Sequence, residues 1–174
     1  LAMEYARREC GRGRRVLYLT YNKNLARNII SCLGEQCGEN IKIVNLHALF
    51  GEYVRVDAEA MAQDPNLYFT QELPEDVLSY LEELSQEELG ALQFDDLILD
   101  EGQDILKPEY LLAMDLLLKG GLEKGCWAVF YDEKQNLYNP EFADGFQLLT
   151  SYSNTRFKLF INCRNTAQIG TFNA

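Results

Sequence analysis

The chain has 174 residues, a mass near 20.0 kDa, a formal net charge of −11 and a sequence pI near 4.5. Its content of 47% hydrophobic and 25% charged residues is typical of one globular domain, with or without a small insert, and excludes a disordered, collagen-like or coiled-coil protein. No apolar run approaches the roughly 18 residues of a membrane span and no secretory signal is evident, so we expect a cytoplasmic protein with no membrane partner.

Short apolar runs alternate with segments of helical spacing along most of the chain. In chain order, we expect a helix over 1–10, a strand over 15–20, a helix over 24–33, strands over 41–44 and 96–100, a helix over 108–119, and strands over 127–131 and 157–161. The strands are almost wholly apolar, as in strands that are covered on both faces. The pattern therefore predicts an α/β domain with a mostly parallel sheet flanked by helices.

Residues 51–93 break this alternation and predict a small acidic helical insert between two parts of one domain, 1–50 and 94–174. Ten Asp or Glu and no Lys or Arg occur within residues 56–90. Apolar residues recur at helical spacing after Pro74, namely Val77, Leu78, Leu81 and Leu84. Ser85 and Glu88 have the spacing of a helix capping box.

The net charge hides a basic segment, because residues 1–30 hold seven Arg or Lys and only two Glu. Nucleic-acid binding on one face is therefore possible. The five arginines of this segment's centre fit the solvated end of a helix better than a phosphate-binding surface; they are Arg7, Arg8, Arg12, Arg14 and Arg15. Five cysteines without a CxxC pair, and one histidine, favour reduced thiols over a zinc site or a disulfide framework.

Polar side chains follow every expected strand, and in open parallel sheets ligands bind beyond the carboxyl ends of the strands. The strand over 96–100 ends in two adjacent carboxylates, Asp100 and Glu101. This is the Walker B arrangement, in which one carboxylate holds Mg²⁺ and the next polarises the water that attacks the γ-phosphate. Taken alone, the pair fits equally well a plain strand followed by an acidic turn.

The sequence from Asp100 to Asp104, Asp-Glu-Gly-Gln-Asp, resembles the DEAQD/DEGQD motif of superfamily 1 helicases of the UvrD/Rep/PcrA type. Four further segments resemble that family's motifs in the family's order: residues 17–26 motif Ia, 44–50 the "TFH" block, 129–138 motif III, and 159–166 motif IV. The resemblance implies a RecA-like P-loop NTPase core. It also implies the first motor domain of an ATP-dependent DNA helicase or translocase, a class that includes 3′-to-5′ DNA-repair enzymes.

The resemblance also implies roles for single residues on the ATP side of such a site. Asp100 would help to hold Mg²⁺, and Glu101 would be the catalytic base. Gln135 would sense the γ-phosphate of ATP and link it to the DNA contacts, and Arg164 would reach the γ-phosphate and stabilise charge in the transition state. Ordinary roles stay open for the last two, as a turn residue and as a surface ion pair respectively.

On the nucleic-acid side, the resemblance places four residues along single-stranded DNA, free or as the tail of a duplex: Thr20, Asn22, His47 and Tyr138. His47 would lie near a phosphate, and Tyr138 would stack on a base, a contact that tolerates any sequence. His47 as a packed structural histidine and Tyr138 as an ordinary aromatic residue remain open alternatives.

The 174 residues of the chain contain no G-x-x-x-x-G-K-[ST] loop. The sequence also departs from the family pattern at Asn45, Leu46, Tyr131 and 139–140. We expect the loop and a second RecA-like domain to lie outside the 174 residues, so that the chain alone neither hydrolyses ATP at a useful rate nor unwinds DNA. Two alternatives are a non-motor P-loop module that switches or binds with nucleotide, and an RNA-directed motor of the same superfamily.

Overall fold

Four parallel strands form the sheet of the structure, a computed structural model that describes residues 1–132, 135, 141–152 and 155–158. They are β1 (Val16–Thr20), β2 (Ile41–Asn45), β3 (Asp96–Asp100) and β4 (Cys126–Phe130), in the order β2-β1-β3-β4. Every neighbouring pair is parallel, which confirms the predicted α/β class. Of the fifth expected strand, Phe157 and Lys158 are not in a strand, and residues 159–161 lie outside the described residues.

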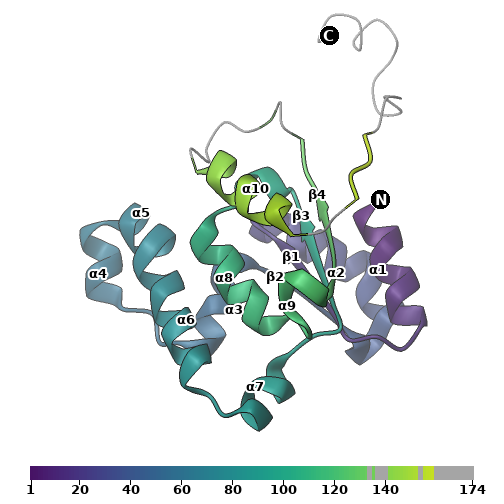
Figure 1. Ribbon diagram of the computed structural model, residues 1–174, viewed down its shortest axis with the longest axis horizontal. Coiled ribbons are helices and arrows are strands. Elements are labelled where there is room, and N and C mark those ends of the chain that lie inside the picture. Colours follow the sequence, from purple (N-terminus) through teal and green to yellow (C-terminus); the bar gives the residue numbers. More distant parts are fainter. Residues whose placement is uncertain (133–134, 136–140, 153–154, 159–174) are drawn as a thin grey trace, which may run out of the picture.

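Helices cover both faces of the sheet (Figure 1). On one face lie α1 (Ala2–Gly11) and α2 (Lys23–Cys37). On the other lie α3 (Leu46–Tyr53), α8 (Pro108–Leu117), α9 (Gly121–Lys124) and α10 (Phe142–Ser151). The expected helices over 1–10, 24–33 and 108–119 are confirmed, the second of them longer than its apolar pattern. Among the described residues, none of the helices has both the length and the apolarity to cross a bilayer.

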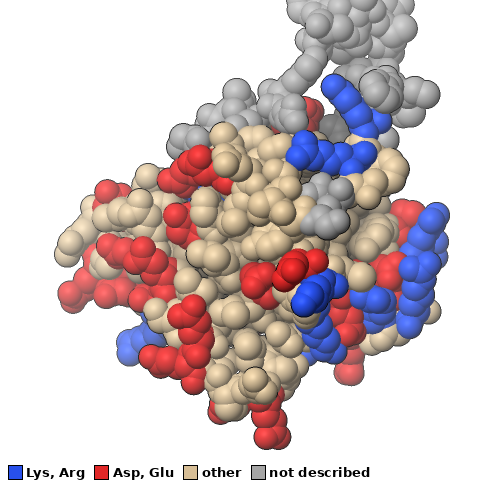
Figure 2. Space-filling view, viewed as in Figure 1, with Lys and Arg blue, Asp and Glu red and all other residues tan. Residues whose placement is uncertain are grey.

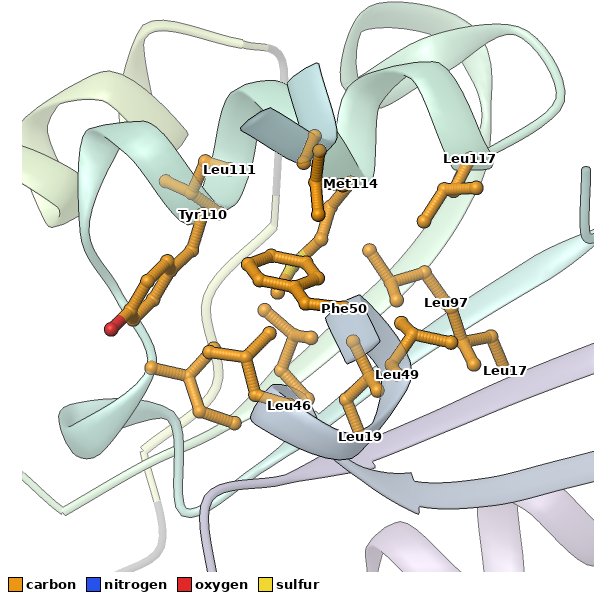
Figure 3. Close-up of a cluster of buried hydrophobic side chains, with 14 of the residues drawn as sticks. Leu17, Leu19, Leu46, Leu49, Phe50, Leu97, Tyr110, Leu111, Met114 and Leu117 are labelled. Carbon is orange, nitrogen blue, oxygen red and sulfur yellow. The ribbon is translucent and has the colours of Figure 1, made fainter. Parts of the chain in front are cut away.

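Side chains of the strands alternate between two buried clusters, as the period of two in a strand requires. Val16, Tyr18 and Ile98 pack against α1 and α2. Leu17, Leu19, Leu97 and Leu99 join the larger cluster beneath α3 and α8. Figure 3 shows Phe50 at the centre of this larger cluster, and its ring meets that of Tyr110 edge to face at 5.9 Å. All five residues of β1 are buried because the strand has neighbours on both sides and helices on both faces.

Every regular element between β2 and β3 is helical, as the spacing of residues 51–93 predicts. After α3 come α4 (Ala58–Gln63), α5 (Pro65–Leu67), a π-helical turn (Tyr68–Glu72), α6 (Leu73–Glu83) and α7 (Gln86–Leu92). The capping box at α7 is confirmed: the Ser85 Oγ accepts from the Glu88 N–H at 3.3 Å, and the Glu88 carboxylate accepts from the Ser85 N–H at 2.9 Å. Fully buried side chains of α6 enter the larger cluster, so these helices share the core of the sheet.

Charge is divided between the two sides of the molecule. Figure 2 shows acidic side chains over the helices between β2 and β3, and basic side chains over α1 on the opposite side. The basic side chains form ion pairs with carboxylates of the same chain. Arg7 and Arg8 pair with Glu4, and Arg12 pairs with Glu9. Arg14 pairs with Asp96, and Arg15 donates to the carbonyl oxygens of residues 91 and 93. These contacts support the interpretation of the cluster as a helix end rather than a phosphate-binding surface.

A matched pair of leucines on α8 tests the position of the core. Leu111 is fully buried in the larger cluster, whereas its neighbour Leu112 is 45% exposed. Leu111→Ala removes buried methyl groups and leaves a cavity, so we expect it to lower the free energy of unfolding by roughly 2 to 5 kcal/mol. Leu112→Ala is expected to change it by less than about 1 kcal/mol. Urea unfolding followed by circular dichroism measures both, and equal losses would contradict the packing described.

Candidate functional site

The register of the sheet brings the strand ends to one edge, as expected from the sequence. Thr20 at the end of β1 is paired with Asn45 of β2 on one side and with Asp100 of β3 on the other. Asp100 is in turn paired with Phe130, the last residue of β4. The segments that follow these four residues therefore start side by side, and we call this border of the sheet the carboxyl edge.

Asp100 is held by hydrogen bonds to both of its carboxylate oxygens. The Tyr18 hydroxyl donates to Oδ2 at 2.5 Å, and the Glu101 N–H donates to Oδ1 at 3.2 Å. Tyr18 is fully buried, and burial together with the bond to Asp100 raises the pKa of its hydroxyl, which keeps the proton available for donation. The strand β1 thus fixes the plane of the carboxylate at the tip of β3.

The backbone turns sharply after Asp100. Glu101 has φ 56°, in the left-handed region, and is the one non-glycine residue with positive φ in the part of the chain that the structure describes. Such a conformation costs free energy in a residue with a side chain and is concentrated at functional sites. At Gly102, an added Cβ would lie 2.5 Å from Cγ1 of Val129, so only glycine allows the turn to lie this close to β4.

A buried amide joins this turn to the loop after β4. Gln103 is 2% exposed; its Nε2 donates to Oε2 of Glu101 at 2.7 Å, and its Oε1 accepts from the Asp132 N–H at 3.1 Å. Asp132 then accepts on Oδ2 from Nε2 of Gln135 at 2.8 Å. The predicted site residues Glu101 and Gln135 are thus connected through two residues that the motif roles leave out. For Gln103, the available signal was a polar residue placed inside the DEGQD motif.

The residues at the end of β1 that we expect to contact nucleic acid differ in their exposure at the carboxyl edge. Thr20 is fully buried, and its Oγ1 has no hydrogen-bond partner among the described residues. Asn22 caps α2, because its Oδ1 accepts from the N–H groups of Asn24 and Leu25. Tyr21, between them, is 41% exposed and was not predicted to act. The sequence signal that could have identified Tyr21 is its position as an aromatic residue directly after a strand.

His47 is packed among aromatic rings and is held in the neutral form. Its ring centroid lies 5.2 Å from that of Tyr21, 4.7 Å from that of Phe69 and 6.4 Å from that of Tyr110. Burial, followed by the nearby Lys107 ammonium, lowers the pKa of His47 from 6.5 to about 4. Its buried Nε2 has no hydrogen-bond partner among the described residues. At neutral pH, therefore, His47 can meet a phosphate only as a neutral hydrogen-bond donor, not as a cation.

A cavity of about 430 Å³ lies between the inserted helices and the loops before α8 and α10. Asp64, Thr70, Lys107 and Glu141 are among the residues that line it. The Lys107 ammonium lies 2.9 Å from the Glu141 carboxylate. Neither Asp100 nor Glu101 lines the cavity, so it is separate from the carboxylates that the sequence singles out.

A magnesium ion fits this edge only as an ion shared with a phosphate. Among the described residues there is no cluster of three or more His, Cys, Asp or Glu side chains that is able to hold a metal. Mg²⁺ is commonly bound by one or two carboxylates together with substrate phosphates and water, and an oriented Asp100 meets that requirement. Two predicted site residues, Tyr138 and Arg164, lie outside the described residues.

Comparisons of the chain with protein-family models, with curated proteins and with solved structures give no match. The roles of the residues are therefore argued below from the motifs and from the geometry of the carboxyl edge.

The single histidine gives a direct test of the aromatic packing. We expect the one imidazole resonance of the folded protein to titrate with a midpoint near 4 in a proton NMR pH series, because burial and Lys107 both oppose the charged form. A midpoint near 6.5 would contradict the burial of the ring.

The same shift predicts the direction of a stability change. Above pH 6.5 His47 is neutral in both the folded and the unfolded state. As the pH falls from about 6.5 to about 4, the unfolded state takes up a proton that the folded state does not, so the free energy of unfolding decreases. His47→Phe keeps an aromatic ring and should remove this part of the pH dependence, which denaturant unfolding at several pH values measures.

Proposed function

We propose that these 174 residues form the hydrolysis side of a RecA-like motor domain that couples ATP hydrolysis to movement on single-stranded DNA. The triphosphate-binding loop and a second RecA-like domain would come from outside these residues. The observation that carries the proposal is the hydrogen-bonded connection from Glu101 through Gln103 and Asp132 to Gln135, next to an oriented Asp100. A plain strand followed by a solvated acidic turn has no need of such a connection.

Asp100 and Glu101 suit different parts of ATP hydrolysis. Asp100 lies at the strand tip with both oxygens held by hydrogen bonds, so it would be one ligand for a Mg²⁺ bound together with the phosphates. Glu101 follows on a left-handed turn and receives an amide hydrogen bond, which holds a carboxylate ready to orient a water molecule and to accept its proton. When bound, ATP would supply the phosphoryl group and Mg²⁺ would offset part of its negative charge.

The adjoining ends of β1 and β2 suit a nucleic-acid strand. Tyr21 presents an exposed aromatic ring against His47, and base stacking on such a ring is independent of sequence. The helix α3 begins directly after β2, and the side chain of its N-cap Asn45 makes no capping bond, so in the proposal a phosphate oxygen accepts from the first-turn N–H groups in its place. In the proposal, Tyr21 and Asn22 contact the nucleic-acid strand, and the buried Thr20 of β1 supports them from within the sheet.

The alternatives from the sequence predict different outcomes in the same assays. A nucleotide-dependent switch module would bind nucleotide without hydrolysis that is stimulated by single strands. An RNA-directed motor would be stimulated by RNA rather than DNA of the same sequence. Measurements of phosphate release with each polymer therefore separate the three functions.

Replacement of the proposed catalytic base tests the hydrolysis side. In the full protein that supplies the triphosphate loop, we expect Glu101→Gln to keep nucleotide binding within about twofold and to lower turnover by roughly 100-fold or more, because an amide cannot accept the proton of water. Binding is measured with a fluorescent ATP analogue and turnover by phosphate release. Glu35→Gln on the exposed face of α2 is the matched control and should leave both unchanged. Unchanged turnover in Glu101→Gln would remove Glu101 from this role.

Two exposed tyrosines test the nucleic-acid side. Tyr21→Ala should weaken binding of a fluorescent single-stranded oligonucleotide by roughly 5- to 150-fold, equally for thymine and mixed sequences, because one stacked base is worth about 1 to 3 kcal/mol. Tyr80 on α6 is similarly exposed, at 37% against 41% for Tyr21, and its ring stacks on that of Tyr53. Tyr80→Ala should therefore leave the anisotropy titration unchanged. Equal losses in the two variants would argue against an interface at the carboxyl edge.

A further inference from the structure

We propose that Gln103 is a positioning residue that holds the Glu101 carboxylate and couples it to the loop carrying Gln135. This inference rests on the proposed function, because it assigns Gln103 to the same hydrolysis site. It goes beyond the roles of Asp100, Glu101 and Gln135, since Gln103 itself contacts neither nucleotide nor water in the proposal and acts through its two neighbours.

The geometry of the amide carries the proposal. Both ends of the Gln103 side chain are engaged, one toward the turn after β3 and the other toward the loop after β4. Only 2% of Gln103 is exposed, so its amide is largely shielded from water, and an amide left without partners there would be costly. The side chain is thus held in place by the two loops that it joins.

Glutamine is chemically suited to this place, because one side chain must donate to a carboxylate and also accept from a backbone N–H. A glutamate of the same size keeps the acceptor but loses the donor, and sets a second carboxyl group against Glu101. A leucine of similar volume loses both bonds. The close approach of Gly102 to Val129 brings the turn near enough to β4 for the bridge to form.

The consequence is that the proposed base and the proposed phosphate-sensing residue form one connected unit. Three hydrogen bonds separate Glu101 from Gln135, and each is no longer than 3.1 Å. When Gln135 moves to meet a γ-phosphate, the displacement passes through Asp132 and Gln103 to the carboxylate of Glu101. Gln103 therefore makes the position of the base depend on the phosphate site.

The first experiment tests the bridge without any ATPase measurement. Amide hydrogen exchange of the 174-residue chain should show a protected Asp132 N–H, and Gln103→Leu should speed its exchange roughly tenfold through loss of the acceptor. Gln103→Glu keeps the acceptor and should retain most of the protection. Equal exchange in the wild type and in Gln103→Leu would overturn the bridge, and if Gln103→Leu does not fold, an unprotected Asp132 N–H in the wild type would do the same.

The second experiment tests positioning in the full protein. Gln103→Glu and Gln103→Leu should each lower kcat roughly tenfold or more and leave the KM for ATP within about twofold. Either change added to Glu101→Gln should cause little further loss, because both act through the same carboxylate. The control is Gln93→Leu at the other end of β3, where the Gln93 amide donates to the carbonyl oxygen of Leu116 at 3.0 Å; it should leave kcat unchanged.

The outcomes separate this proposal from the function on which it rests. If Glu101→Gln is inactive while both Gln103 variants keep wild-type kcat, Gln103 is not a positioning residue and the proposed function stands. If Glu101→Gln keeps its turnover, the proposed function fails and the positioning role fails with it. The exchange experiment then decides separately whether the bridge between the two loops exists.

Discussion

Strand β3 pairs in parallel with β1 on one side and with β4 on the other, and this pairing decides where every candidate site residue lies. Because the strands run in the same direction and in register, Thr20, Asp100 and Phe130 end at the same level of the sheet. The loops that follow then meet without any long connection across the surface. Had one of these strands run in the opposite direction, its polar end would lie beside Arg14 and Asp96 at the far border.

The turn after β3 contains several features that oppose stability when each is considered alone. Glu101 adopts a left-handed backbone conformation, Gly102 has no side chain to pack, and Gln103 places an amide in a buried position. Each is acceptable because the surroundings are rigid: β3 is buried on both faces, and the apolar residues that follow the turn, Ile105 and Leu106, are fully buried. Local costs of this kind, supported by a well-packed core, are typical of functional sites.

The sequence alone predicted the elements whose signal is local. Apolar runs identified the four strands, and their parallel arrangement followed from alternation with helices. The capping box of Ser85 and Glu88 was correctly predicted, since its partners are three residues apart. The placement of Asp100 and Glu101 at the carboxyl edge also followed, because it depends only on strand direction.

Features made by contacts between distant segments were not predictable in this way. Tyr18 of β1 donates to Asp100 of the neighbouring strand β3, 82 residues away in the sequence, and nothing in either local sequence indicates the bond. His47 is neutral because Phe69 of the insert and Tyr110 of α8 bury it, so the family-based role near a phosphate did not anticipate its protonation state. The cap made by Asn22 was accessible in principle, since asparagine before a helix commonly takes this role, but the motif drew attention to nucleic acid instead.

The two sides of the proposed site meet at Asp104, the last residue of the 3₁₀ turn (Gly102–Asp104) that also carries Gln103. Burial and then the charge of Glu101 raise the pKa of Asp104. Burial and then the charge of Asp104 raise the pKa of Tyr21. Asp104 is thus an electrostatic neighbour of both the proposed base and the proposed stacking ring. In the proposed function, a nucleic-acid strand that moved Tyr21 would change the electric field at this turn, and a phosphate that moved Gln135 would act on the same turn through Gln103. In the proposed function, the turn after β3, rather than any single catalytic group, would therefore link the nucleic-acid side of the site to the nucleotide side.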